Sequence, residues 1–139
     1  MAVSRVGMIG LGIMGSAMAA NLLVAIHNVS AAEAVVLARR SGLNPALAVK
    51  VLGDGAGSSR MLQVRGPMMA RRAYRDATMK VEVWQKDMKI IGDFVKQLGS
   101  PAPLFAATKA VYNAAMAQGH ARHDTAAVCA VLEKPGRKP

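Results

Sequence analysis

The sequence predicts a mainly α-helical fold: a helical bundle with one long N-terminal helix, preceded by a short residual β-strand. Hydrophobic residues make up 53% of the 139 residues, and most of them are Ala, Val, Leu and Met, with only five aromatic residues. Ala, Leu and Met favour helices. Residues 14–40 contain no proline, and glycine or proline recurs between the later helical segments.

The predicted strand is the apolar run VGMI, residues 6–9, and a G-x-G-x-x-G motif follows it directly. In such a motif the first glycine allows a tight turn, the second lets the backbone approach a pyrophosphate, and the third lets helix and strand pack closely. The helix N-terminus then faces the phosphate charge. The predicted cofactor-binding residues of this turn are Gly10, Leu11, Gly12, Ile13, Met14 and Gly15.

The motif lacks its usual continuation. A dinucleotide-binding βαβ unit carries a second strand and, about 20 positions on, an acidic residue that holds the ribose. Glu33 lies at that separation, but it falls in the middle of a helical segment, SAAEAVVLA. The sequence therefore has the start of a dinucleotide-binding domain without its second strand.

The helices are predicted from their capping residues. The long helix covers residues 14–40, about 40 Å at 1.5 Å per residue, with Gly42 just past its end. Asn44 and Pro45 begin a helix to residue 52, Ser58 or Ser59 caps a short helix through residue 64, and Pro67 begins another turn. Three further helices are predicted over residues 79–99, 104–119 and 125–134, the last one capped by Asp124.

The formal net charge of +10 raises the question of nucleic-acid binding. The 18 Lys and Arg residues are spread along the chain, and no run of them exceeds two. No zinc-finger, RRM or helix-turn-helix signature accompanies them. We therefore expect a basic surface that attracts anionic ligands, and no nucleic-acid partner.

Residues 6–32 carry no charged side chain, so they imitate a membrane span, and together with Arg5 they imitate a signal peptide. The glycines are spaced for a turn, and Asn21, His27 and Asn28 would be buried polar groups in lipid. We expect no membrane association, with membrane insertion or export as the alternative. The single cysteine, Cys129, suits a reducing cytoplasm and lies in an apolar run typical of a core.

His120 and His123 stand beside Asp124 in the sequence, which is a combination that can hold a metal ion. Asp124 is better placed to cap the helix that follows, and no further ligands converge in the sequence. We therefore predict no metal site.

Several segments resemble the β-hydroxyacid dehydrogenases, which include 3-hydroxyisobutyrate dehydrogenase and tartronate semialdehyde reductase. VGMIGLGIMGSAMAANLL (6–23) is similar to the family's N-terminus. NLLVAIHNVSAAEAVVLARRSGLNP (21–45) is similar to the long helix that leads into its C-terminal helical domain, and WQKDMKII and HDTAAVCAVLEK resemble later pieces of that domain. The resemblance implies a residual Rossmann start over residues 1–23 and a helical dimerisation and substrate domain over residues 21–139, with most of the cofactor domain absent between them.

The resemblance also implies site residues. The family's catalytic lysine lies three residues before an Asn-Asn pair and falls on Ala17, while the first Asn falls on Ala20. Asn21 matches the second Asn, a substrate-binding position. Lys86 matches a lysine that faces the nicotinamide end of the cofactor, with a solvated charge beside Asp87 as the alternative. No catalytic residue is therefore predicted in this chain.

The resemblance implies NAD or NADP as the cofactor and a small β-hydroxyacid as the substrate. Without the lysine and most of the cofactor domain, we expect no activity from the chain alone and cofactor binding no tighter than about millimolar. The alternative is a non-catalytic helical dimerisation or interaction module. Because the long helix is apolar on nearly every face, we expect a homodimer or higher homo-oligomer.

Overall fold

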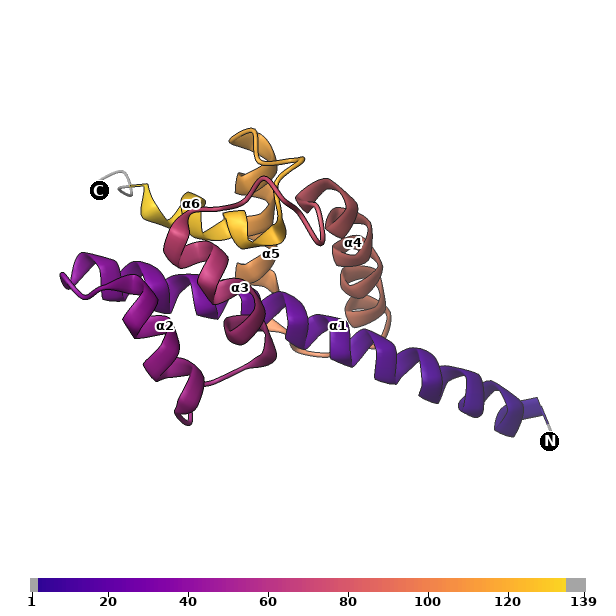
Figure 1. Cartoon of the computed structure of the whole chain (residues 1–139). Helices are drawn as coiled ribbons and strands as arrows, with labels where there is room; N and C mark the ends of the chain where they lie inside the picture. The colour runs from indigo at the N-terminus through magenta and orange to yellow at the C-terminus, as the bar shows by residue number, and fades with distance from the viewer. Residues whose placement is uncertain (1–2, 135–139) are drawn as a thin grey trace.

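The computed structural model describes the backbone of residues 3–134 and the side chains of residues 12–134 (Figure 1). The elements are α1 (Val3–Arg40), α2 (Pro45–Asp54), α3 (Arg60–Arg71), α4 (Val81–Gln97), α5 (Pro103–Ala117), the 3₁₀ turn η1 (Thr125–Ala127) and α6 (Val128–Glu133). Residues 3–134 contain no strand, only an isolated antiparallel bridge between Lys80 and Asp124. The predicted mainly α-helical fold with one long N-terminal helix is confirmed.

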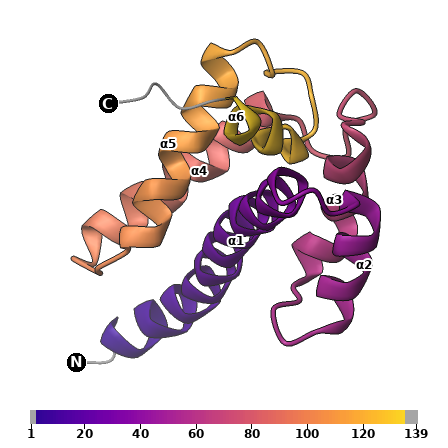
Figure 2. The same cartoon turned by 90° about the vertical axis from the view of Figure 1, so that its left-hand side faces the viewer.

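Helix α1 is the axis of the molecule and contacts all five other α-helices. Figure 2 shows α4 and α5 on one side of it and α2 and α3 on the other. The N-terminal part of α1 extends beyond the other helices (Figure 1). By length and composition alone, Gly12–Arg40 could cross a membrane, with a mean hydropathy of 1.5, but the core helix of a soluble protein passes the same test.

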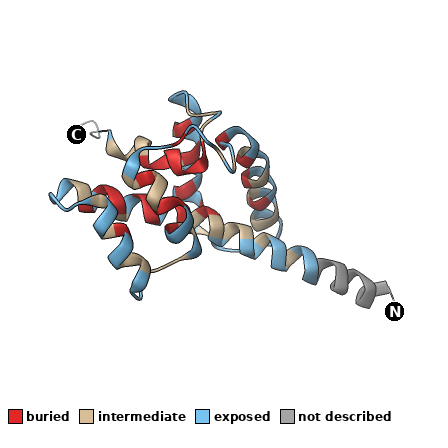
Figure 3. Cartoon of the chain, in the orientation of Figure 1, coloured by how far each residue is buried: buried red, intermediate tan, exposed pale blue. Residues whose placement is uncertain are grey.

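The core lies where the helices meet α1 (Figure 3). Along α1 the fully buried residues include Ala25, Ala32 and Val35, whose spacing places them on one helix face. Side chains of α4, α5 and α6 pack against this face, among them Met88, Ile91, Tyr112 and Val128. Small alanines on α1 let the neighbouring helices approach closely, which compensates for the shortage of large aromatic side chains.

The structure corrects the predicted N-terminal strand. Residues 6–9 belong to α1, which runs without interruption from Val3. A single strand with no neighbour leaves its backbone N–H and C=O groups unpaired, whereas a helix pairs them within the same segment. The second strand missing from the sequence is thus the physical reason why the first strand does not form.

The predicted caps are confirmed where a side chain or a glycine acts locally. The Asn44 side chain accepts hydrogen bonds from the backbone N–H groups of Ala46 and Leu47, and α2 begins at Pro45. Gly42 follows α1 with φ +79°, a left-handed conformation that side chains other than glycine rarely adopt. The Ser59 hydroxyl accepts from the N–H of Leu62 at the start of α3.

A second correction concerns Pro67, which was expected to begin a new helical turn. It lies inside α3, which continues to Arg71. The residue before a proline normally avoids the helical region because its Cβ clashes with the proline ring, but Gly66 has no Cβ. Leu62 and Met69 are both buried, so one continuous helix also covers the core better than two short ones.

Candidate functional site

The glycine motif lies inside α1, with no turn at Gly10, Gly12 or Gly15. In the interior of a helix each backbone N–H is bonded to the carbonyl four residues earlier. The amides of this segment are therefore not free to cradle a pyrophosphate. An added Cβ at Gly12 or Gly15 would meet nothing within 4 Å, so neither glycine marks a close approach to another part of the chain.

Beside the motif, the space between α1 and α4 forms an apolar groove of about 380 Å³. Its lining consists of Gly15, Met18, Ala19, Leu22, Ile91, Phe94, Val95, Leu98 and Ser100. None of these side chains is charged, and the Ser100 hydroxyl is the lone polar side-chain group among them. The groove therefore offers apolar contact and no charge to balance the phosphates of a dinucleotide.

The positions implied by the resemblance are spread over two helices. Ala17 is exposed and Asn21 is half-buried on α1, while Lys86 is exposed on α4. Among the described residues, neither the Asn21 amide nor the Lys86 ammonium has a hydrogen-bond partner. The structure thus shows no assembled group of proton donors at these positions.

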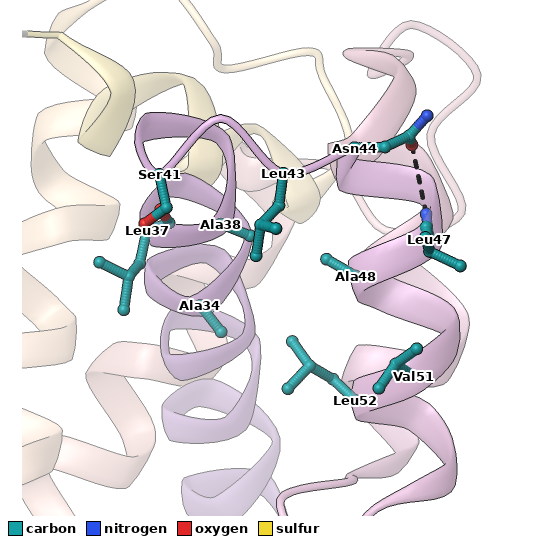
Figure 4. A pocket seen from close by; sticks show the side chains of 10 residues that line it. All are labelled: Ala34, Leu37, Ala38, Ser41, Leu43, Asn44, Leu47, Ala48, Val51 and Leu52. Carbon is teal, nitrogen blue, oxygen red and sulfur yellow. Dashed lines mark hydrogen bonds between the residues drawn. The ribbon is translucent and has the colours of Figure 1, made fainter.

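A second groove, of about 440 Å³, separates the C-terminal end of α1 from α2 (Figure 4). Its walls are formed by Ala34, Leu37, Ala38, Ser41, Leu43, Asn44, Leu47, Ala48, Val51 and Leu52. The lining is almost wholly apolar, and four of its large side chains (Leu37, Leu43, Leu47 and Val51) are at least 60% exposed. Such a surface suits another apolar helix face better than a charged substrate.

Asp124 organises the principal buried polar cluster. As predicted, it caps the C-terminal helical segment, because its carboxylate accepts from the N–H of Ala126. It also accepts from the Arg65 guanidinium, and from the hydroxyl and backbone N–H of Thr78 and the N–H of Met79. The capping signal was visible in the sequence, whereas the partners from α3 and the following loop were not.

The charge of Asp124 is held in place by these donors. Burial by itself would raise the pKa of the carboxyl. The N–H groups of Ala126 and Met79 and the Arg65 guanidinium outweigh burial, and the pKa of Asp124 lies below its usual value. Asp124 is therefore an ionised structural carboxylate whose lone pairs are occupied by the chain itself.

The two histidines of the loop after α5 face each other, with 2.9 Å between the Nδ1 atoms of His120 and His123. Asp124 does not join them, because its carboxylate is turned to Arg65. Among the described residues no group of three or more His, Cys, Asp or Glu side chains converges. Burial, followed by the neighbouring His123, lowers the pKa of His120.

A further polar contact crosses the core between α1 and α5. The Asn28 amide donates to the Tyr112 hydroxyl at 2.8 Å and to the Thr125 carbonyl at 3.0 Å. Burial raises the pKa of Tyr112 to about 12, so the hydroxyl stays protonated. Cys129 is fully buried in α6, and burial raises the pKa of its thiol, as suits an inert core residue.

Comparison with known proteins identifies the fold. Residues 16–132 match the family model described as the NAD-binding domain of NADP-dependent 3-hydroxyisobutyrate dehydrogenase. The chain is 31% identical over 119 residues to an L-threonate dehydrogenase of Cupriavidus necator. The aligned region covers 84% of this chain and 40% of that protein. It is 29% identical over 112 residues to the 2-hydroxy-3-oxopropionate reductase of Escherichia coli, covering 81% of this chain and 38% of that protein.

A solved 3-hydroxyisobutyrate dehydrogenase from Salmonella typhimurium superposes with a TM-score of 0.80 at 27% identity, over 84% of this chain and 41% of that one. The chain therefore spans about 40% of the length of these three proteins. The matched residues 16–132 lie within α1 to α6 of this chain. The chain belongs to the β-hydroxyacid dehydrogenase family.

Proposed function

We propose that this member of the family does not transfer hydride by itself and acts as a self-associating helical module in the cytoplasm. The observation that carries the proposal is the continuity of α1 through the glycine motif. The backbone N–H groups of residues 10–15 are hydrogen-bonded within α1. The segment therefore lacks the exposed N–H groups by which a Rossmann turn binds pyrophosphate. Weak binding of NAD or NADP through residues 10–15 and Lys86 is the most that this geometry supports.

The position of Ala17 supports the same conclusion. By the resemblance, the proton-donating lysine of the family falls here, and a methyl group neither donates nor accepts a proton. Along the chain, the nearest lysine to Ala17 is Lys50, which lies on another helix, α2. We infer that the chain keeps a substrate-side position, Asn21, without the group that performs the reaction.

The experiment is a calorimetric titration of the chain with NAD⁺, NADH, NADP⁺ and NADPH, followed by turnover assays with L-threonate and 3-hydroxyisobutyrate. We expect dissociation constants no tighter than about millimolar and no turnover. The Escherichia coli 2-hydroxy-3-oxopropionate reductase, assayed with its own substrate, is the positive control for cofactor and detection.

An Ala17→Lys variant restores the missing amine and should remain inactive, because the cofactor site is still incomplete. The competing function is oxidoreductase activity on a small β-hydroxyacid, which the 31% identity to an L-threonate dehydrogenase favours. Micromolar cofactor binding with turnover by the unmodified chain would establish that function and overturn ours.

A further inference from the structure

The loop between α5 and η1 brings two histidine side chains together. The Nδ1 atoms of His120 and His123 lie 2.9 Å apart, and the ring centroids lie 5.2 Å apart with the ring planes inclined at 48°. Both residues are half-buried, so the pair is held by the chain and still reached by solvent. Imidazole nitrogens are ligands that suit several transition metals, and two of them at this distance meet the first requirement of a chelating site.

Backbone hydrogen bonds fix both histidines before any ligand arrives. The N–H of His120 donates to the Ala115 carbonyl near the end of α5, and the N–H of His123 donates to the His120 carbonyl. The His123 carbonyl accepts in turn from the N–H of Val81, the first residue of α4. The loop is thus tied to two helices, and little conformational freedom remains to be lost when the two rings take a common partner.

The contact between the two Nδ1 atoms involves one hydrogen. When both rings are neutral, one Nδ1 carries the hydrogen and donates it to the lone pair of the other. A metal ion needs both lone pairs, so the donating ring moves its hydrogen from Nδ1 to Nε2 on binding. The pair then loses no proton, and the metal takes the place of the shared hydrogen.

The surroundings of His120 favour the uncharged ring, which is the form that binds a metal. Burial, followed by the neighbouring His123 and Lys134, lowers the pKa of His120. The ring therefore has a free lone pair at pH 7, and no proton has to be displaced from it before a metal binds.

The separation of the two nitrogens selects the coordination geometry. With metal–nitrogen bonds of about 2.0–2.1 Å, ligands 90° apart at the metal lie about 2.9 Å from each other, whereas tetrahedral ligands lie about 3.3 Å apart. The observed distance of 2.9 Å is the one expected for adjacent ligands of a square-planar or octahedral ion. Cu²⁺ and Ni²⁺ adopt this geometry with nitrogen and oxygen ligands, while Zn²⁺ prefers the tetrahedron.

The two rings are the ligands that the described part of the chain provides, and water completes the coordination. Asp124 is not a third ligand, because its carboxylate is turned to Arg65. Among the described residues no other His, Cys, Asp or Glu joins the pair. Since the formal net charge of the chain is +10, general electrostatic attraction does not hold a cation here, and the affinity has to come from the two nitrogens.

We propose that His120 and His123 chelate a divalent transition metal of tetragonal geometry, Cu²⁺ more tightly than Ni²⁺, through their Nδ1 atoms. The order of the two metals follows the general affinity series for nitrogen ligands. The site lies outside residues 10–15, Asn21 and Lys86, and it does not depend on the function proposed above.

Calorimetric titration of the full chain with NiCl₂ and with ZnCl₂ at pH 7 tests the pair. We expect one Ni²⁺ per chain, bound more tightly than Zn²⁺ because the nitrogens are set for angles of 90°. His120→Gln and His123→Gln should each weaken Ni²⁺ binding at least about tenfold, since each removes one of two ligands. His27→Gln removes a half-buried histidine on α1 and is the matched control, which should bind Ni²⁺ like the wild type.

Pulsed electron paramagnetic resonance with one equivalent of CuSO₄ identifies the ligands. The wild type should show modulation from the remote Nε2 nitrogens of two imidazoles, which a terminal amine or a backbone amide does not produce. The double variant His120→Gln/His123→Gln should lose this modulation, with an unchanged helical circular dichroism spectrum. Lys134→Gln should tighten Ni²⁺ binding, because it removes a positive charge close to the His120 ring.

The contrary outcomes are specific. Equal Ni²⁺ affinity of the wild type and the double variant would place the metal elsewhere and overturn the site. A loss confined to one of the single variants would overturn the chelate, and tighter binding of Zn²⁺ than of Ni²⁺ would overturn the tetragonal geometry. None of these results bears on cofactor binding or self-association, so this proposal and the proposed function fail independently.

Discussion

Arg65 and Asp124 meet in the core although 59 residues separate them in the sequence, with the Arg65 Nε donating to Asp124 Oδ1 at 3.0 Å. The Asp124 side chain is wholly shielded from solvent and that of Arg65 is 9% exposed. The contact joins α3 to the turn that precedes α6. Through the backbone N–H groups of Thr78 and Met79, the same carboxylate also fixes the loop that leads into α4.

Asp124→Asn should destabilise the fold by about 3 kcal/mol, because it leaves the Arg65 charge buried without a partner and presents an amide to backbone donors. Urea denaturation followed by circular dichroism measures this change. Asp93→Asn is the matched control: it breaks an exposed ion pair with Lys89 on α4 and should leave the unfolding midpoint unchanged. Equal midpoints for wild type and Asp124→Asn would show that the cluster contributes no stability.

Acid should remove the same contribution. Since the pKa of Asp124 is lower in the folded chain than in the unfolded chain, its stabilising effect is present above the unfolded value of about 4. This stabilising effect is lost as the pH falls from about 4 through the pKa that Asp124 has in the folded chain. The difference in unfolding free energy between wild type and Asp124→Asn should therefore shrink as urea titrations move from pH 5 to pH 2. A difference that stays constant over this range would contradict the assignment.

His120 should make the fold sensitive to pH in a higher range. Burial and the adjacent His123 lower its pKa, so the unfolded chain binds a proton more readily than the folded chain. Stability from the neutral form is present above the unfolded value of about 6.5 and is lost as the pH falls below it. His120→Gln should flatten the dependence of the melting temperature on pH between 7 and 5, and an unchanged slope would contradict the assignment.

Gly66 on α3 packs directly against the Val49 side chain of α2. A Cβ added there would lie 2.8 Å from Val49 Cγ1 and 3.3 Å from Leu62 Cδ1. Gly66→Ala should therefore cost about 1–3 kcal/mol by overpacking, measured by thermal unfolding. Gly53→Ala in α2, where a Cβ meets nothing within 4 Å, is the control and should not destabilise. Adding Val49→Ala to Gly66→Ala should recover part of the loss; no recovery would place the clash elsewhere.

The parts of the fold that depend on neighbouring residues could be predicted from the sequence. Asn44, Gly42 and Asp124 act on backbone groups within a few positions, so their capping roles follow from local chemistry. The strand predicted at residues 6–9 is wrong because the glycine motif is a local signal, whereas a strand also needs a partner strand, which this sequence lacks.

The polar contacts between residues distant in the sequence could not be predicted, because local signals do not show which segments pack together. Nothing near Arg65 in the sequence points to Asp124, and nothing near Asn28 points to Tyr112, since both pairs depend on how helices distant in the sequence cross. Pro67 does not begin a new helical turn as predicted, because α3 continues through it and buries Leu62 and Met69 on one face. The site residues taken from the resemblance, Asn21 and Lys86, remain predictions.

The reactivity of the Cys129 thiol can report how often α6 separates from α1. It is the sole cysteine of the chain, and its thiol is fully enclosed where α6 packs on α1. A thiol reagent can reach it only when this packing comes apart, so the rate of labelling measures how often the C-terminal segment separates from the long helix. Kinetics of that reaction, with no engineered probe, would follow the fold at its centre while the surfaces on α1 and α2 are altered.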